Sequence, residues 1–388
     1  MQEMTHSTDI LTRDDSHDYL DDHNAIQDQV QPTIQRGTLV LEDGTRLEGR
    51  SFGYRGETAG EVVFSTGMVG YPESLTDASF AGQILIMTYP LIGNYGVPDR
   101  ALWESDKMQV SGLIVSDYNS IPSHVQSVMS LATWLQQEGI PALEIKDTRF
   151  LTQHIRKHGT MLGKIVFESD IPFHDPDTEN LVAQVSTKQV IEEGEGDITI
   201  ALIDCGAKRN IAHALAARNV RVVTVPWDYD LFSPENTLRF DGLMVSNGPG
   251  NPKMAQETIQ TLRTALTSDV PTMGICLGHQ LLALAAGGDT YKLKFGHRSQ
   301  NQPCVQPGTK RCYITTQNHG FAVGTLPPEF DPWFVNANDG SNEGMRHRSR
   351  PVFSVQFHPE ATPGPMDTEW LFDHFLDTVR QVKRGLEK

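Results

Sequence analysis

A cysteine between two glycines stands where an apolar strand is expected to turn into a helix. Cys276 lies in the sequence Gly-Ile-Cys-Leu-Gly at 274–278, after the apolar run 270–273 and before the apolar stretch 279–286. Small flanking residues permit the tight strand-to-helix turn, the nucleophile elbow, that lifts a nucleophile out of a sheet. Unpaired N–H groups at a helix start favour a thiolate. The pattern therefore predicts a nucleophilic cysteine, although a cysteine in an apolar run is more often a small buried hydrophobic residue.

Two other segments favour the catalytic interpretation. At 353–360 an alternating strand is expected to end in His358, and Glu360 follows two residues later. That order suits a general base and the carboxylate that orients it, whereas without the cysteine an ordinary surface pair would be the better interpretation. The Gly/Pro loop 246–252 directly follows an expected strand, and its backbone N–H groups could approach an oxyanion. The three segments together predict a Cys-His-Glu triad.

A metal site is the main alternative for these residue types, and none is expected in this chain. Zinc sites that use a His-x-Glu spacing also need a Cys-x-x-Cys pair, and Cys304 and Cys312 are too widely spaced to form one. His279 and His319 are expected to hydrogen-bond the elbow or a loop. Lys208 follows an expected strand end, as a phosphate-binding residue can, but no P-loop or Gly-x-Gly-x-x-Gly pattern accompanies it.

These segments resemble the triad-type, class I glutamine amidotransferases, and the resemblance covers about residues 197–384. Further motifs resemble the small, glutamine-hydrolysing subunit of carbamoyl-phosphate synthase, in the second half (294–297, 301–303, 317–323 and 363–365) and in the first (41–45, 60–64, 70–71, 75–77 and 88–96). The first half makes the resemblance specific, since other amidotransferase families lack this domain. The resemblance implies an α/β fold, in which a smaller mixed β/α domain precedes a parallel, flavodoxin-like sheet.

Glutamine hydrolysis requires a nucleophile, an oxyanion site and an acid for the departing ammonia. Cys276 is expected to form a γ-glutamyl thioester, His358 to protonate ammonia and then activate water, and Glu360 to orient the imidazole. Elbow geometry places the N–H of Leu277 in the oxyanion hole, with Gly248 as the second donor. The resemblance implies that six further residues contact glutamine: Ser79, Gly250, Gln280, Asn318, Gly320 and Phe321. Since Ser79 belongs to the first half, the pocket is expected at the domain boundary.

The resemblance implies that this chain passes ammonia to a separate, large synthetase subunit, with which it would form a heterodimer. That subunit would make carbamoyl phosphate from bicarbonate and ATP, so ATP and magnesium are expected only there and no cofactor is expected in this chain. The product could serve pyrimidine or arginine biosynthesis. One alternative is an amidotransferase for another synthetase, such as one for GMP or anthranilate; a second is a non-catalytic, glutamine-sensing regulatory subunit. The first half argues against the former and the complete triad against the latter.

Composition restricts the partners and the compartment. The chain has 388 residues and a formal net charge of −17, which argues against nucleic-acid or anionic-membrane partners, because both need a basic face. Its four cysteines are too few for a disulfide framework in a chain of this length, so a reducing compartment is expected. No stretch is long and apolar enough to span a bilayer, and no secretory or transit peptide is recognisable. We expect a cytoplasmic protein.

Composition and periodicity together divide the chain into four parts: a disordered acidic tail (1–36), a first domain (37–185), a linker (186–197) and an amidotransferase domain (198–384). In the first domain we expect a hairpin at 38–49, strands at 62–64, 84–87 and 113–115, and helices at 128–135 and 149–155. In the second we expect strands at 198–203, 220–225, 242–245 and 272–275, and helices at 209–218, 254–266 and 279–286. Alternating strands and helices predict a parallel sheet with ligands at the carboxyl ends of its strands.

Overall fold

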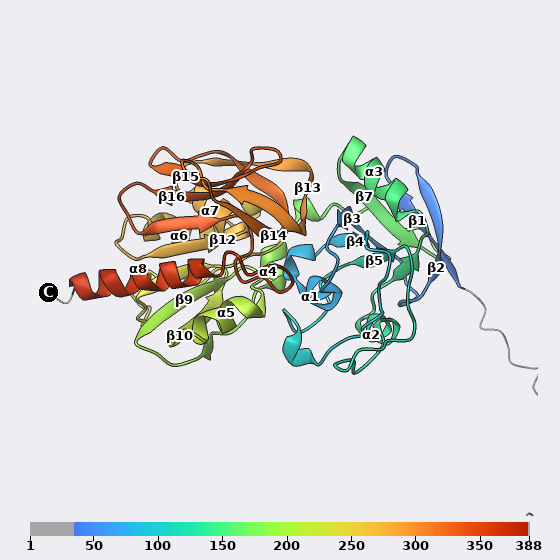
Figure 1. Ribbon diagram of the computed structural model, residues 1–388, viewed down its shortest axis with the longest axis horizontal. Coiled ribbons are helices and arrows are strands. Elements are labelled where there is room, and N and C mark those ends of the chain that lie inside the picture. Colours follow the sequence, from blue (N-terminus) through green and yellow to red (C-terminus); the bar gives the residue numbers. More distant parts are fainter. Residues whose placement is uncertain (1–34, 387–388) are drawn as a thin grey trace, which may run out of the picture. The chain divides into compact units, whose positions relative to one another are not determined.

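Seven strands of the first half close into a barrel in the computed structural model, which describes residues 35–386 (Figure 1). The strands are β1 (Arg36–Leu41), β2 (Arg46–Ser51), β3 (Thr58–Ser65), β4 (Gln83–Met87), β5 (Gly112–Val115), β6 (Ala142–Glu144) and β7 (Met161–Val166). Their order around the barrel is β1-β2-β6-β5-β4-β3-β7. The expected hairpin is β1 and β2, paired antiparallel. The tail predicted for 1–36 lies outside the described residues, apart from its last two positions.

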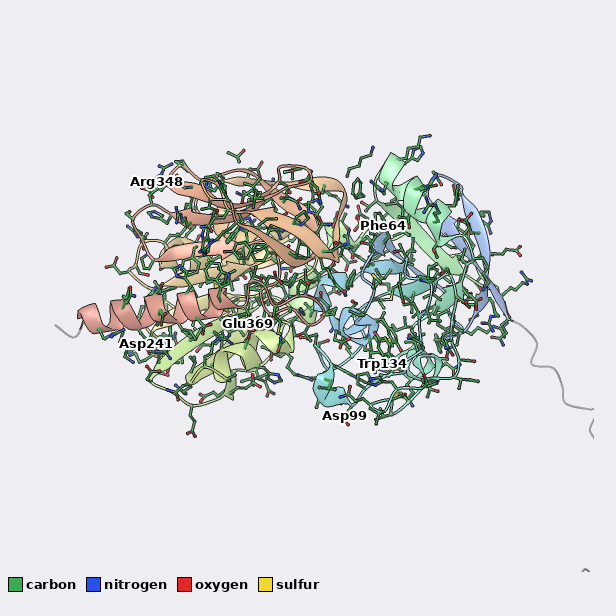
Figure 2. All side chains as sticks on the ribbon, viewed as in Figure 1. Phe64, Asp99, Trp134, Asp241, Arg348 and Glu369 are labelled. Atoms are coloured by element: carbon green, nitrogen blue, oxygen red, sulfur yellow. The ribbon has the colours of Figure 1, made fainter. Side chains whose placement is uncertain are left out.

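Short helices connect the barrel strands: α1 (Tyr71–Thr76), α2 (Leu131–Glu138), α3 (Thr148–His158) and the 3₁₀ turns η1 (Ala78–Phe80) and η2 (Arg100–Leu102). The 3₁₀ turn η3 (Pro176–Thr178) and α4 (Leu181–Val185) follow the last barrel strand and lead into the second half. The helix predicted at 128–135 begins three residues later, as α2, because Ser130 caps it: Ser130 Oγ accepts from the backbone N–H of Thr133 at 3.1 Å. Gly139, in the left-handed conformation, ends it. Trp134 of α2, labelled in Figure 2, packs on Trp103 with ring centroids 4.5 Å apart.

The second half forms a ten-stranded sheet, in the order β14-β13-β15-β16-β17-β12-β11-β9-β10-β8. Its parallel centre consists of β9 (Ile198–Asp204), β10 (Val220–Pro226), β11 (Gly242–Val245), β12 (Thr272–Ile275) and β17 (Val352–Val355). Antiparallel strands flank this centre: β8 (Ile191–Glu193), β13 (Asp289–Val305), β14 (Cys312–Thr325), β15 (Phe330–Asn336) and β16 (Asn342–His347). The parallel centre agrees with the predicted fold class, whereas the antiparallel strands were not predicted. One of them, β8, lies inside the segment predicted as a linker.

Helices cover both faces of this sheet: α5 (Arg209–Ala216), α6 (Gln256–Ala265), α7 (Leu277–Ala285) and α8 (Trp370–Leu386), with a 3₁₀ turn η4 (Pro252–Met254) before α6. Strand β9 shows the arrangement. Ile200 and Leu202 pack in one apolar cluster with α5 and α8, whereas Ala201 and Ile203 pack in a second cluster with α6 and α7. Burial of both faces explains why the parallel strands read as continuous apolar runs.

The strand predicted to run up to His358 ends earlier. Strand β17 stops at Val355, because the next backbone N–H groups leave the neighbouring strand β12. Gln356 N donates instead to Glu343 O at 2.9 Å, and His358 N donates to Thr316 O at 2.9 Å. His358 is therefore held by β14, and Gln356 by β16, rather than by the parallel centre of the sheet. Among the residues that the structure describes, no helix has the length and apolar character needed to cross a membrane.

Candidate active site

Cys276 occupies the turn between β12 and α7, with φ 53° and ψ −101°. Positive φ is strained for a residue with a side chain, so the surroundings must enforce it. Its N–H donates to Val355 O at 2.8 Å. A Cβ on Gly274 would lie 2.5 Å from the carbonyl oxygen of Gly278, and one on Gly278 would lie 2.3 Å from that of Val245. Both flanking positions therefore require glycine, and the predicted elbow is present.

The three residues predicted as a triad meet in the interior. Cys276, His358 and Glu360 are all buried, and His358 Nδ1 lies 2.6 Å from Glu360 Oε1. The sulfur of Cys276 faces the carbonyl oxygen of Asn318 at 3.7 Å. His358 Nε2 has no hydrogen-bond partner among the described residues. This nitrogen is therefore available to the Cys276 thiol or to a departing ammonia.

Charge keeps the imidazole of His358 protonated. Burial alone would lower the pKa of His358, but the charge of Glu360, the nearby Cys276 and the hydrogen bond to Glu360 raise it to about 10. Burial would raise the pKa of Glu360, but Lys208 and His358 lower it to about 2. At neutral pH the geometry therefore holds an imidazolium against a carboxylate.

Lys208 is a fourth charged member of this cluster. Its Nζ lies 3.1 Å from Glu360 Oε1 and donates to the carbonyl oxygen of Ala361. The ammonium group is buried, and although burial acts to lower the pKa of Lys208, the carboxylates of Glu360 and Glu104 raise it. Sequence reasoning considered Lys208 only as a phosphate ligand and missed this contact, because Glu360 is distant in the chain and no local pattern connects them.

One narrow pocket, with a free volume of about 30 Å³, brings together most of the predicted substrate contacts. Its lining includes Ser79, Gly248, Gly250, Cys276, Gln280, Asn318, Gly320 and Phe321. Leu277 is the first residue of α7 and directly follows the thiol. Gln280 Nε2 donates to the carbonyl oxygen of Phe321 at 2.8 Å. The predicted residues thus lie around one space, next to the nucleophile.

The barrel domain contributes a loop to this pocket. Asp77 accepts from the backbone N–H of Ser79 at 2.9 Å, and Asn318 Nδ2 donates to the other carboxylate oxygen at 2.8 Å. Asn247 Nδ2 donates to Ser79 Oγ at 3.0 Å and to Asp77 Oδ1 at 3.2 Å. Asp77 and Asn247 were not predicted. They join the barrel loop to the amidotransferase domain, which explains how Ser79 reaches the pocket.

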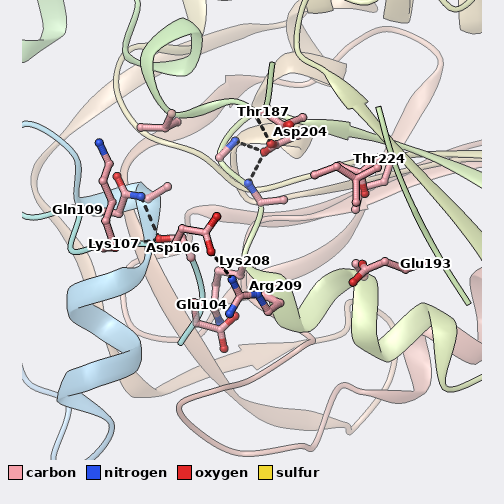
Figure 3. A pocket seen from close by; sticks show the side chains of 18 residues that line it. Glu104, Asp106, Lys107, Gln109, Thr187, Glu193, Asp204, Lys208, Arg209 and Thr224 are labelled. Atoms are coloured by element: carbon pink, nitrogen blue, oxygen red, sulfur yellow. Dashed lines mark hydrogen bonds and ion pairs between the residues drawn. The ribbon is translucent and has the colours of Figure 1, made fainter. Parts of the chain in front are cut away.

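A second connection runs through Glu104, beside a cavity of about 420 Å³ between the domains (Figure 3). The backbone oxygen of Glu104 accepts from Arg209 N at 2.9 Å, and its carboxylate accepts from Asn210 N at 3.0 Å. Burial is the main reason that the pKa of Glu104 rises to about 7. Asn210 Nδ2 in turn donates to the carbonyl oxygen of Glu360 at 2.5 Å. The barrel therefore supplies the N-terminal cap of α5, the helix that follows Lys208.

Among the described residues, one group could bring three metal ligands together: His297, His319 and Glu343, with ligand atoms within 4.8 Å of one another. Hydrogen bonds already occupy several of these atoms. His297 Nε2 lies 2.8 Å from Asp339 Oδ2, and His319 Nδ1 lies 2.8 Å from the Phe321 carbonyl oxygen. The absence of a metal from this chain remains a prediction. His279 is the other histidine predicted to be structural, and its Nδ1 lies 2.8 Å from Oγ of Ser354 in strand β17.

The elbow, the triad and the surrounding sheet define a class I glutamine amidotransferase. The model of that family, glutamine amidotransferase class-I, matches residues 201–378. A second model, carbamoyl-phosphate synthase small chain, CPSase domain, matches residues 39–165. The chain belongs to the carbamoyl-phosphate synthase small-chain family, as its relatives show.

The arginine-specific small chain of carbamoyl phosphate synthase from Aspergillus fumigatus is 46% identical to this chain, over 92% of this chain and 82% of that protein. The multifunctional protein CAD of Squalus acanthias is 49% identical, over 90% of this chain and 16% of that protein. The mitochondrial carbamoyl-phosphate synthase [ammonia] of Homo sapiens is 47% identical, over 90% of this chain and 24% of that protein. The chain thus spans most of the fungal small chain and a minor part of the two longer proteins.

Proposed function

We propose that this chain hydrolyses glutamine through Cys276 and delivers the ammonia to a large synthetase subunit, which makes carbamoyl phosphate from bicarbonate and ATP. The observation that carries the proposal is the buried cluster of Cys276, His358, Glu360 and Lys208 beside a pocket to which both domains contribute. The family match of the first half supports the choice of synthetase.

The geometry supports a two-stage hydrolysis. The sulfur of Cys276 attacks the γ-amide carbon, and the N–H groups of Leu277 and Gly248 stabilise the resulting oxyanion. The protonated His358 donates its Nε2 proton to the departing nitrogen, which leaves as ammonia. Neutral His358 then accepts a proton from water as the water attacks the thioester carbon. The C–S bond breaks, Cys276 regains its thiolate, and glutamate leaves.

The Cys276→Ala variant tests the proposal directly. We expect the complex with the synthetase subunit to lose synthesis from glutamine, while synthesis from added ammonia continues at the wild-type rate because free ammonia bypasses the thioester. Cys312→Ala, which changes an exposed cysteine, serves as the matched control and should retain both activities. Wild-type glutaminase activity in Cys276→Ala would contradict the nucleophile assignment, and loss of both activities would contradict the division of labour.

Substrate entry and coupling also follow from the pocket. Its free volume of about 30 Å³ holds little more than a water molecule, so glutamine enters only if the lining residues move. Since Ser79 and Asp77 belong to the barrel, a small movement between the domains would change the pocket. We therefore expect slow glutamine hydrolysis by the isolated chain and acceleration by the synthetase subunit.

Glutaminase kinetics with and without that subunit, bicarbonate and ATP test the coupling. Full activity in the isolated chain, unchanged by all three additions, would refute it.

ATP and magnesium are assigned to the partner, and the proposed location is the cytoplasm. The free thiols of Cys205, Cys276, Cys304 and Cys312 support a reducing compartment.

A further inference from the structure

The turn that carries His358 and Glu360 is strained directly after the carboxylate. Ala361 N donates to the carbonyl oxygen of His358 at 3.2 Å, and within this turn Glu360 Oε1 lies 2.6 Å from His358 Nδ1. The next two residues, Ala361 and Thr362, have φ values of 55° and 47°. Left-handed backbone is unfavourable for residues with a side chain, so neighbouring groups must hold it in place. The pairing of the imidazole with its carboxylate depends on those groups.

Asn210, in the first turn of α5, contacts the strained turn on both sides of Ala361. Its Nδ2 donates to the carbonyl oxygen of Glu360 at 2.5 Å and to Thr362 Oγ1 at 2.6 Å. A carbonyl oxygen can only accept, so the NH₂ group of Asn210 must face it. The turn lines a cavity of about 470 Å³, so packing from the described residues leaves one side of it open. Hydrogen bonds from the start of α5 therefore hold the turn.

Helix formation does not explain the asparagine at this position. Asparagine is a poorer helix former than alanine, and it is favoured at an N-cap, where its side chain bonds its own helix. The N-cap of α5 is Lys208, and no side chain caps this helix. The amide of Asn210 instead reaches a carbonyl group 150 positions later in the chain. Its side chain serves the turn and not the helix.

Asn210 connects the barrel to the strained turn without touching the substrate. Its backbone N–H donates to the carboxylate of Glu104, a barrel residue, at 3.0 Å. It does not line the narrow pocket that brings together the predicted substrate contacts, the glutamine pocket. We propose that Asn210 is a positioning residue of the triad, whose amide holds the strained turn so that Glu360 keeps the imidazole of His358 in place. This assignment rests on the proposed function.

Loss of this contact should slow the reaction and leave substrate binding intact. His358 gives a proton to the departing ammonia and later takes one from water, and a ring that rotates away from the thiol does neither. In the complex with the synthetase subunit, Asn210→Ala should lower kcat for glutamate release roughly tenfold and change KM for glutamine by less than about twofold. Alanine favours a helix, so α5 should remain. Synthesis from added ammonia should continue at the wild-type rate.

Two further substitutions test the cause of the effect. Asn210→Asp keeps the size of the side chain but turns an oxygen toward the Glu360 carbonyl oxygen, so kcat should fall at least as far as in Asn210→Ala. Asn236→Ala is the matched control, because Asn236 Nδ2 also donates to a carbonyl oxygen, that of Leu231 at 2.7 Å, but does not line the glutamine pocket. The control should match the wild type. A wild-type kcat in Asn210→Ala, or a raised KM with unchanged kcat, would overturn the proposal.

A double-mutant cycle distinguishes positioning from a general loss of structure. In a Glu360→Ala chain, Asn210→Ala should lower kcat no further, because the carboxylate that it positions is gone. A fall of roughly tenfold in both backgrounds would overturn the proposal, since Asn210 would then act independently of Glu360. Thermal unfolding of each chain shows whether the fold is retained, and rates are compared per folded protein.

Thr362 tests the same contact from its other end, and it decides the case if Asn210→Ala does not fold or Glu360→Ala is too slow to measure. Thr362→Val keeps the branched shape but removes the hydroxyl that the Asn210 amide contacts, so kcat should fall about threefold with KM unchanged. Thr362→Ser keeps the hydroxyl and should retain the wild-type kcat. Equal kcat values for these two variants would overturn the proposal. A wild-type complex that hydrolyses no glutamine would overturn the proposed function, whereas wild-type kcat in the Asn210 and Thr362 variants would overturn only the positioning role.

Discussion

The amidotransferase side and the barrel side of the active site are built from different kinds of structure. On the amidotransferase side, Cys276 directly follows β12 and Gly248 follows β11, two parallel strands whose carboxyl ends meet at one edge of the sheet. On the barrel side, Asp77 and Ser79 belong to a short loop and a 3₁₀ turn, and Glu104 lies in a separate loop. The sheet positions the reacting groups, whereas single side-chain hydrogen bonds position the supporting ones.

This difference indicates where the site can adjust. The elbow is fixed by backbone contacts that leave no room for a Cβ on Gly274 or Gly278. The barrel loop reaches the pocket through hydrogen bonds from two amide side chains, those of Asn247 and Asn318. A few hydrogen bonds of this kind contribute on the order of 1 kcal/mol each, so a partner can shift the loop more easily than the elbow. Substitutions on the two sides should therefore differ in the size and the kind of their effect.

The largest effect is expected for Lys208→Met, on the amidotransferase side. The change removes one of the two cations beside the buried carboxylate of Glu360, so that only the His358 imidazolium remains, and it loosens the orientation of His358. We expect kcat for glutamine to fall roughly a hundredfold or more and the thermal midpoint to fall by several degrees. Lys310→Met, at an exposed lysine, is the matched control. A Lys208→Met complex with wild-type kcat would show that Glu360 needs no second buried cation besides His358.

A smaller effect, of a different kind, is expected for Asp77→Asn on the barrel side. The new NH₂ group faces either the Nδ2 of Asn318 or the two donors to the other oxygen, so at least one hydrogen bond is lost. We expect KM for glutamine to rise about tenfold, with kcat changed less than in Lys208→Met.

Asp99→Asn provides the control for that prediction. Asp99, labelled in Figure 2, also accepts from a backbone N–H two residues later, that of Ala101 at 2.9 Å, but it is exposed and does not line the glutamine pocket. The control should match the wild type. A loss of kcat in Asp77→Asn as large as that in Lys208→Met would remove the distinction between the two sides.

The same difference explains what could be predicted from the sequence. The elbow around Cys276 is a local pattern. No Cβ fits at Gly274 or Gly278, so both positions require glycine, and these glycines are visible in the sequence beside the nucleophile. The contact between Lys208 and Glu360 joins residues 152 positions apart, and no spacing rule connects a buried lysine to its carboxylate. Ser79 was placed at the pocket only through a family resemblance.

The fold was predicted to a similar extent. Apolar runs identified the parallel strands β9 to β12, because strands buried on both faces leave a continuous signal. The antiparallel strands β13 to β16 have mixed burial and irregular register, so their pattern is weaker. Closure of the first half into a barrel depends on pairing between β1 and β7, and the segments at 36–41 and 161–166 show no sequence signal for each other.

The smallest effect is expected for Glu104→Gln, and it should depend on pH. Burial raises the pKa of Glu104 to about 7 in the folded chain, above its ordinary value of 4.5. Below pH 4.5 the carboxyl is neutral in both the folded and the unfolded state. Between pH 4.5 and pH 7 the carboxyl is ionised in the unfolded state but still largely protonated in the folded state, so the folded wild type loses stability relative to a chain without this group, and the loss levels off above pH 7. Glutamine cannot ionise, and its side-chain oxygen can still accept from Asn210 N.

Thermal unfolding between pH 4 and pH 9 therefore distinguishes the two chains. The midpoint of Glu104→Gln should equal that of the wild type near pH 4 and exceed it by a few degrees at pH 8, because about 1 kcal/mol shifts the midpoint of a large domain by a few degrees. Asp106→Asn, at an exposed carboxyl that also lines the cavity, is the matched control. A Glu104→Gln chain that is less stable than the wild type at pH 8 would mean that the ionised carboxylate, held by Lys208 and the start of α5, stabilises the contact between the domains. The barrel side would then depend on charge as strongly as the triad does.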